Sequence, residues 1–253
     1  MMKRALLALH ILWLVGRPLW AQDVSHVELR HLVDSPTAGL LSQWTYACDL
    51  RVFPNGGVLA KVSVGLLSRF SAGLSYGGLN IIGQGELNWN PRIEFQARVR
   101  VVDEGFFRPA LACGFDSQGY GCYDEGLERY QIKSKGVYAV LSKSFWLLGP
   151  LGLHGGANYS FEDRDKDDDI SFFAGVDKDL LAGFVLLAEY DFALNDNRED
   201  GVYGAGGGYV NAGLRWTFAK KLSLEFDFKN LADNREDSPR VGREVRIVYW
   251  DQF

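Results

Sequence analysis

From residue 42 onward, large apolar residues alternate with small or polar ones in a series of short stretches. In residues 58–66, valine and alanine alternate with lysine, serine and glycine, and residues 70–77 repeat the pattern with phenylalanine and tyrosine. A period of two predicts β-strands. Because the second face carries mostly small and polar residues, the large residues must face an apolar medium. The pattern favours a transmembrane β-barrel, apolar outside and polar inside, over a soluble sandwich.

The same alternation recurs twelve times, and an even number of strands is typical of bacterial single-chain barrels. Every second connection is short and the others are long, as expected for periplasmic turns and external loops; only the tight turn at 54–57 departs from this series. We expect an all-β, antiparallel transmembrane barrel with strands at 42–53, 58–66, 70–77, 92–101, 108–116, 132–142, 151–161, 170–176, 184–192, 210–218, 222–229 and 244–249.

The first 21 residues have the pattern of a cleaved secretory signal peptide. Lys3 and Arg4 precede an apolar run at 5–15, and Ala21 is followed by polar residues. The run is shorter than the roughly 20 residues of a transmembrane helix. Residues 22–41 do not alternate, and we expect a periplasmic arm or a lid over the barrel mouth. The expected organisation is a signal peptide at 1–21, the arm or lid at 22–41, and a bacterial outer-membrane barrel at 42–253.

Charge and cysteine content exclude some classes of function. Removal of the signal peptide leaves 24 Lys and Arg against 32 Asp and Glu, a net charge of −8, which argues against a nucleic-acid partner. Cys48, Cys113 and Cys122 lack paired spacing and predict no disulfide framework, although a bridge between the last two stays open. No motif for a cofactor is present, and we expect none.

A run of aspartates at alternate positions follows the strand at 151–161. Asp163, Asp165, Asp167 and Asp169 superficially resemble a calcium loop, but the glycine at the sixth place and the glutamate at the twelfth are missing. We expect a solvated loop and no metal site. Loose divalent bridging to lipopolysaccharide is an alternative.

The polar faces of the strands supply charged residues for the lumen. Arginines on the lipid face would cost about 2–4 kcal/mol each near the bilayer midplane, so the arginines of 92–101 are expected to face inward. Basic residues on that strand and acidic residues on the later strands lie on different walls. We therefore favour pairing across a narrow lumen over an open pathway. The lumen-facing candidates are Arg92, Glu94, Arg98, Arg100, His154, Glu189, Asp191, Arg215, Glu225, Asp227 and Lys229.

The first and last strands must pair if the barrel is to have no edge. Asp49 and Arg51 on the first strand are expected to meet Glu244 and Arg246 on the last, so that opposite charges face each other at this closure seam. The terminal Phe253, in phase with the outward residues, resembles the signal read by the outer-membrane barrel assembly machinery. The other expected partners are outer-membrane lipid and lipopolysaccharide.

An enzymatic function is weighed because outer-membrane phospholipases also have twelve strands. They carry His and Ser two positions apart on one strand face. Here His154 and Ser160 are about 20 Å apart at ~3.3 Å per residue, and Gly156 stands where the nucleophile is needed. We therefore expect no enzyme and a structural role for His154 in the lumen.

Three segments resemble the YjbH-like outer-membrane proteins, a family associated with exopolysaccharide production and secretion. They are Asp-Leu-Arg-Val-Phe-Pro-Asn-Gly-Gly at 49–57, Gly-Leu-Ser-Tyr-Gly-Gly at 73–78 and Trp-Asn-Pro-Arg at 89–92. The resemblance is confined mainly to residues 49–92 and implies a link to exopolysaccharide, with polysaccharide-export components as partners. The expected function is transport or export across the outer membrane through a narrow charged lumen. The alternative is a non-conducting barrel that serves as an assembly or surface-interaction partner.

Overall fold

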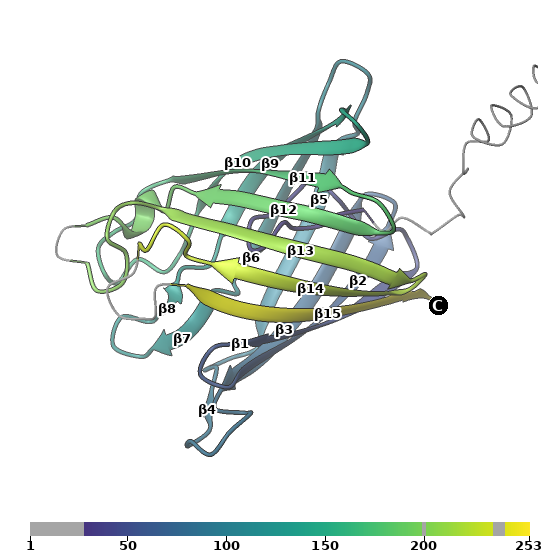
Figure 1. Cartoon of the computed structure of the whole chain (residues 1–253). Coiled ribbons are helices and arrows are strands. Elements are labelled where there is room, and N and C mark those ends of the chain that lie inside the picture. Colours follow the sequence, from purple (N-terminus) through teal and green to yellow (C-terminus); the bar gives the residue numbers. More distant parts are fainter. Residues whose placement is uncertain (1–27, 199–200, 235–240) are drawn as a thin grey trace, which may run out of the picture.

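The computed structural model describes residues 28–198, 201–234 and 241–253, and the predicted signal peptide lies outside them. Within these residues twelve antiparallel strands close into a barrel (Figure 1), which confirms the predicted fold. The ring consists of β1 (Thr45–Phe53), β2 (Gly57–Leu67), β3 (Phe70–Leu79), β5 (Glu94–Val102), β6 (Ala110–Asp116), β9 (Gly136–Trp146), β10 (Pro150–Tyr159), β11 (Ser171–Asp179), β12 (Phe184–Asp191), β13 (Tyr209–Ala219), β14 (Leu222–Lys229) and β15 (Gly242–Gln252).

Closure occurs between β1 and β15, which pair from Thr45–Gln252 to Val52–Val245. Strands that follow each other in the chain also pair in the ring. The exceptions are that β3 pairs with β5 and that β6 pairs with β9, because the strands between them in the chain are not part of the ring. Short turns join the strands at the end that carries the C-terminus, and the longer loops gather at the opposite end (Figure 1). The alternation of connections is thus as predicted. Following the expectation from the sequence, we call the end with the short turns the periplasmic end and the opposite end the external end.

Apolar side chains cover the outside of the barrel and polar side chains fill the inside. On β2, Val62 is 50% exposed, whereas its neighbours Lys61 and Ser63 are 8% and 3% exposed. Such a continuous apolar exterior is far larger than a water-soluble monomer tolerates, and it suits a lipid bilayer. Other outward residues exposed in the same way are Leu50, Leu74, Phe95, Leu141, Leu153, Phe172, Leu186, Phe226 and Ile247.

Four short elements were not foreseen from the sequence. β4 (Asn88–Trp89) extends β3 beyond the rim, and β7 (Tyr120–Asp124) pairs with β8 (Arg129–Ile132) in a separate hairpin at the external end. The 3₁₀-helix η1 (Leu194–Asp196) follows β12. All of them fall in segments expected to be long loops.

No helix among the described residues is both long and apolar enough to cross a membrane.

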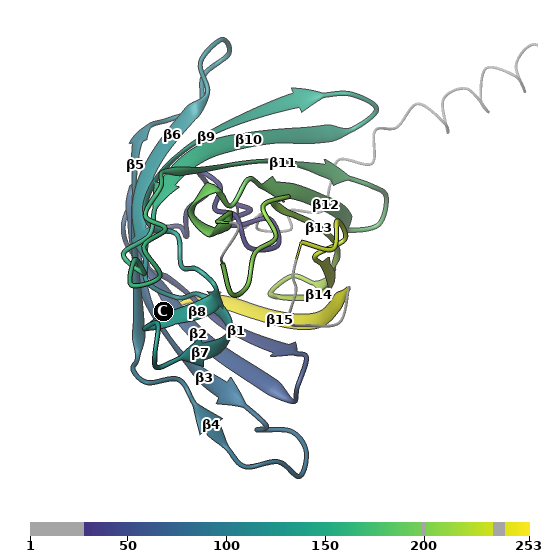
Figure 2. The same ribbon diagram turned by 90° about the vertical axis from the view of Figure 1, so that its left-hand side faces the viewer.

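Residues 28–41 lie inside the ring of strands, where Figure 2 shows them in purple. Leu32, Val33 and Leu41 are fully buried there. The expectation of a periplasmic arm or a lid over the mouth is therefore corrected for this part of the segment, which fills the lumen itself. The physical reason is that its backbone carbonyl and N–H groups form hydrogen bonds with charged side chains of the wall. We call residues 28–41 the plug.

Candidate functional site

The plug enters the lumen as a tight loop held by its own backbone. His31 and Pro36 form an antiparallel bridge, and the Leu32 N–H donates to the Ser35 carbonyl over 3.0 Å. Leu32 packs so closely on β11 that a Cβ placed on Gly175 would collide with its side chain. Glycine at that lumen-facing position therefore makes room for the plug.

The carboxylate of Glu189 on β12 anchors the tip of the plug. It accepts the N–H groups of Val33 at 3.1 Å, Asp34 at 3.0 Å and Ser35 at 2.9 Å. Asn211 Nδ2 donates to the same carboxylate over 2.8 Å. Successive backbone N–H groups around an anion form a nest. A wall carboxylate that is 4% exposed thus obtains its hydrogen bonds from the plug.

Asp34 lies between two cations of the wall. Its Oδ1 is 2.7 Å from Arg51 Nη1, and its Oδ2 is 2.6 Å from Lys229 Nζ. Glu244 adds a second carboxylate, 3.2 Å from Arg51 and 3.4 Å from Lys229. Burial acts to raise the pKa of Asp34, but the two cations hold it below its ordinary value. The ring of Tyr120 on β7 covers this cluster, with its centroid 4.4 Å from Arg51 Cζ and from Lys229 Nζ.

Arg98 on β5 binds the opposite side of the plug through neutral oxygens. Its Nη1 donates to the carbonyls of Arg30 at 2.6 Å and Gly39 at 2.9 Å, and its Nε donates to the Tyr138 hydroxyl at 2.7 Å. No carboxylate pairs with Arg98 in the part of the chain that the structure describes. Its charge is therefore compensated by dipoles of the plug.

Arg100, two residues further along β5, also depends on the plug. It donates to the Ala38 carbonyl at 2.7 and 3.0 Å and pairs with Glu28. The expectation that these arginines pair with acids across the lumen is therefore corrected. The plug occupies the space between the walls, so its carbonyl groups lie closer to these arginines than the acidic residues of the opposite wall do.

A charge network also joins the closure seam to β14. Glu225, which is fully buried, lies 2.5 Å from Arg215 Nε and 3.0 Å from Arg246 Nη1. Arg246 Nε is 3.6 Å from Asp49 Oδ1, and His31 Nδ1 of the plug is 3.2 Å from Arg246 Nη1. Opposite charges therefore do meet near the seam, but between residues that are offset by two positions from the direct register. In direct register Asp49 faces Val248, and Arg51 faces Arg246.

The remaining predicted lumen residues lie at the external end or are buried in the wall. Arg92 precedes β5, is half-exposed at the rim, and pairs with Glu94 at 3.0 Å; it does not line the lumen. Asp191 pairs with Lys135 at 2.5 Å. Asp227 is buried on β14, and neither of its carboxylate oxygens has a hydrogen bond among the described residues.

His154 joins two residues that the sequence analysis did not single out. Its Nδ1 is 2.8 Å from Ser142 Oγ on β9, and its Nε2 is 2.7 Å from Asp177 Oδ1 on β11. Ser142 Oγ also accepts the Ala38 N–H of the plug at 2.8 Å. The three residues lie beside a cavity of about 420 Å³ at the periplasmic end. They come from three strands, so spacing within one strand could not reveal them, and the chain of hydrogen bonds positions the plug.

The external end of the lumen is covered by the β7–β8 hairpin. Arg129, 1% exposed, pairs with Asp165 at 2.5 Å and with Asp196 at 2.8 Å, and Lys133 Nζ is 2.8 Å from Asp165. Asp167 is buried as well. The aspartate run is therefore not a wholly solvated loop. Asp165 pairs with Arg129 and Lys133, and the buried carboxylate of Asp167 accepts the Asn197 N–H at 2.9 Å.

His31 of the plug and Glu162 also have shifted pKa values. Burial, aided by the nearby cations Arg30 and Lys61, lowers the pKa of His31 well below its ordinary value, so His31 is neutral. Burial raises the pKa of Glu162, in the loop after β10, to about 7, although the N–H groups of Tyr130 and Ser134 act to lower it.

The residues described contain no group of three or more His, Cys, Asp or Glu side chains arranged to hold a metal ion.

Comparison with solved structures identifies the type of barrel. The KdgM porin matches with a TM-score of 0.50 at 10% identity, covering 81% of this chain and 98% of the porin. The fold is that of an outer-membrane porin. The NanC porin has a TM-score of 0.44 at 11% identity, covering 82% of this chain and 99% of the other, and the Salmonella typhi outer membrane phospholipase has 0.39 at 11%, covering 83% and 91%.

No family model matches the chain. No curated protein matches its sequence. The porin fold and the apolar exterior together place the protein in the bacterial outer membrane, as the sequence predicts.

Proposed function

We propose that the protein is an outer-membrane transport barrel that is closed by its own plug and opens when the plug leaves the lumen. The observation that carries this proposal is the nature of the contact between plug and wall. Charged wall residues hold the plug mainly through its backbone, as Glu189 does with three N–H groups and Arg98 with two carbonyls.

A plug bound in this way can be exchanged for water or solute. In the part of the chain that the structure describes, the bridge of the plug is internal, between His31 and Pro36, and no strand of the barrel pairs with it. Its removal leaves the twelve-strand ring intact. Every bond that is lost ends on a charged or polar wall group that water can solvate.

The wall around the plug also carries many charges, although Leu32, Val33 and Ala38 of the plug pack on apolar wall residues as well. A barrel filled for stability alone is expected to carry apolar side chains inside, since buried ion pairs contribute little net stability. Here the buried inward side chains include charged residues from both sides of the ring. They are Asp49, Arg51, Lys61, Glu94, Glu189, Glu225, Asp227, Lys229, Glu244 and Arg246.

The cargo that we propose is a carboxylate-bearing polysaccharide. Once the plug has left, Arg100 loses the acceptors of its guanidinium group and Arg98 keeps only the Tyr138 hydroxyl. Guanidinium groups bind carboxylates in a bidentate manner. The YjbH-like residues at 49–92 support a link to exopolysaccharide, and polysaccharide-export components are then the expected partners.

The non-conducting barrel remains the second candidate, because the external end is covered as well. Arg129 of the β7–β8 hairpin is held by two aspartates from different loops. A lumen obstructed at two levels suits a protein whose outer surface binds a partner.

Planar-bilayer recording with a lockable plug separates the two functions. Ala38 N and Ser142 Oγ are 2.8 Å apart, so the two Cα atoms are at most about 7 Å apart, within reach of a disulfide. We would place cysteines at 38 and 142 after replacing Cys48, Cys113 and Cys122 by alanine.

The oxidised variant is expected to be silent, its reduced form to show intermittent currents, and a variant lacking residues 28–41 to show steady currents. The reduced form serves as the matched control. Silence of all three, including the deletion, would instead support the non-conducting barrel. Steady currents from the locked form would show that the plug does not close the lumen.

A further inference from the structure

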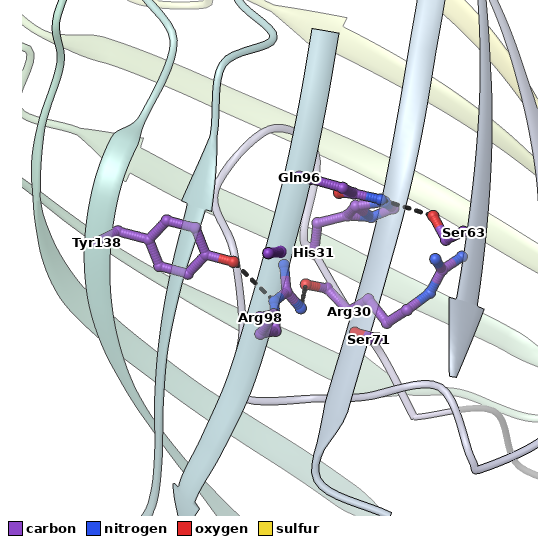
Figure 3. A pocket seen from close by; sticks show the side chains of 8 residues that line it. Arg30, His31, Ser63, Ser71, Gln96, Arg98 and Tyr138 are labelled. Atoms are coloured by element: carbon purple, nitrogen blue, oxygen red, sulfur yellow. Dashed lines mark hydrogen bonds between the residues drawn. The ribbon is translucent and has the colours of Figure 1, made fainter. Parts of the chain in front are cut away.

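A small cavity lies between the plug and the wall formed by β2, β3 and β5 (Figure 3). Its free volume is about 10 Å³, enough for one particle the size of a water molecule. Its polar lining consists of Arg30, His31, Ser63, Ser71, Gln96, Arg98 and Tyr138.

Arg30 of the plug has no partner for its guanidinium group in the part of the chain that the structure describes. The residue is 9% exposed, and Figure 3 shows its side chain extending beside Ser63 and Ser71. A buried guanidinium without an acceptor is unusual, because arginine is almost always paired when it is buried. The missing acceptor is therefore expected to be a ligand.

Arg98 provides a second positive charge beside the same cavity. Its acceptors among the described residues are the Arg30 and Gly39 carbonyls and the Tyr138 hydroxyl, all neutral. Burial lowers the pKa of Arg30 to about 10, Asp49 acts to raise it, and Arg98 lowers it further. Two like charges that repel each other around a cavity favour an anion between them.

Two acidic groups lie near the cavity. Asp49 Oδ1 is 3.6 Å from Arg246 Nε, whereas its Oδ2 is 3.7 Å from His31 Nε2 and has no hydrogen bond among the described residues. Asp116 is 3.3 Å from Lys61 Nζ. Since His31 is neutral, Arg30 and Arg98 leave a positive excess on this side of the lumen.

We propose that this cavity binds one small monovalent inorganic anion, held between Arg30 of the plug and Arg98 of β5. The neutral donors suit such a ligand. Gln96 Nε2 donates to Ser63 Oγ over 2.6 Å, which leaves the Ser63 hydroxyl hydrogen free to point at the anion, and Ser71 adds a second hydroxyl. A carboxylate or a sugar is too large for the cavity.

The bound anion joins plug and wall by a charge bridge, since one guanidinium belongs to each. The site requires only the closed structure, so it stands whether or not the barrel transports a solute. Loss of the anion is expected to weaken the seating of the plug and to leave the ring of strands unchanged.

The test compares halide with a large anion at constant ionic strength. The full mature chain, folded in detergent, is heated in sodium chloride, sodium bromide or sodium gluconate. We expect a saturable rise in Tm of about 2–4 °C with the halides and none with gluconate. Arg30→Gln removes the rise. The control is Arg69→Gln, which removes an exposed arginine paired with Asp103 at a periplasmic turn and keeps the rise.

Anomalous scattering from bromide-soaked crystals of the unaltered protein provides a second measurement in case Arg30→Gln does not fold. A bromide peak between the Arg30 and Arg98 guanidinium groups is the expected result. An equal rise in gluconate, a full halide response in Arg30→Gln, or crystals without a peak at this position would each overturn the anion site, and none of these results bears on conduction.

Discussion

Two walls of the lumen differ in the partners of their buried charged side chains. On what we call the paired wall, formed by β12–β15 and β1, most charges meet charges, as Glu225 does with Arg215 and Arg246. On the arginine wall, which is β5, Arg98 and Arg100 have their partners in the plug. The plug binds both walls, since Glu189, Arg51 and Lys229 of the paired wall also contact it, but among the described residues Arg98 and Arg100 pair with no carboxylate of the wall.

The difference separates the stability of the barrel from the closure of the lumen. Removing one member of a buried ion pair leaves the other uncompensated, and this destabilises the fold itself. Removing an arginine that binds plug carbonyls affects the equilibrium between a seated and a displaced plug. The predictions below test this separation, beginning with the largest expected effect.

Glu225→Leu is expected to lower the free energy of unfolding by about 3–5 kcal/mol, because it leaves Arg215 and Arg246 buried without their shared carboxylate. Denaturant unfolding in lipid vesicles measures the loss. Glu128→Leu is the matched control, since it breaks an exposed pair with Arg164 that is expected to contribute less than about 1 kcal/mol. Equal losses in both variants would mean that the paired wall does not stabilise the barrel.

Glu162 extends the comparison to a carboxylate held by backbone N–H groups instead of by a cation. Its pKa of about 7 lies above its ordinary value of 4.5, so between these pH values the folded chain keeps a proton that the unfolded chain has lost. The free energy of unfolding therefore falls as the pH rises from 4.5 to 7 and falls no further above 7. The full penalty is up to about 3 kcal/mol.

Glu162→Gln removes this penalty. The Tm difference between Glu162→Gln and the unaltered protein is expected to grow from pH 4.5 to pH 7 in favour of the variant and then to stay constant. Other titrating groups cancel in this difference. Glu128→Gln, in an exposed loop, serves as the control; a difference for Glu162→Gln that is flat with pH would show that its carboxylate ionises normally.

Arg98→Ala tests the arginine wall. Loss of two charged hydrogen bonds to the plug is expected to weaken its seating by about 1–3 kcal/mol and to leave unfolding of the barrel nearly unchanged. A cysteine in place of the fully buried Ser35, in a background without native cysteines, reports plug release through its rate of thiol labelling. We expect an increase of about 5- to 150-fold.

Arg69→Ala, at a periplasmic turn, is the control for this measurement. If Arg98→Ala destabilised the barrel as strongly as Glu225→Leu does, the distinction between the two walls would fail.

The sequence predicts the ring of strands well, because each strand is amphipathic over its own length. For example, local alternation alone predicts that Val62 faces outward and that Lys61 faces the lumen. The plug could not be predicted in this way. Its contacts join residues such as Val33 and Glu189, 156 positions apart, and they use backbone groups, which have no signature in the sequence.

The lumen residues were partly predictable for the same reason. The inward direction of Arg98 and Glu225 follows from the strand period, whereas their partners depend on which strands face each other and on what lies between them. The limit of prediction from one strand is clear from the hydrogen-bonded chain of Ser142, His154 and Asp177. Three adjacent strands contribute one residue each, so no spacing within a strand indicates it.

Ser142→Ala is expected to have the smallest effect. It tests an uncharged contact, the hydrogen bond between Ser142 of β9 and the plug, which lies outside both the paired wall and the arginine wall. Ser142 Oγ accepts the Ala38 N–H and contacts His154, so its loss leaves one N–H of the plug without an acceptor. A net cost of about 1 kcal/mol follows for seating the plug, or roughly a fivefold faster labelling of a cysteine at position 35.

Ser144→Ala is the matched control, since Ser144 faces the same side of β9 two residues on but bonds to Glu104 in a periplasmic turn. If both serines had the same small effect, the hydrogen bond to Ala38 would contribute nothing to closure. An effect of Ser142→Ala as large as that of Arg98→Ala would mean that the neutral contact holds the plug as firmly as the arginine wall does, so that closure would not depend on charge.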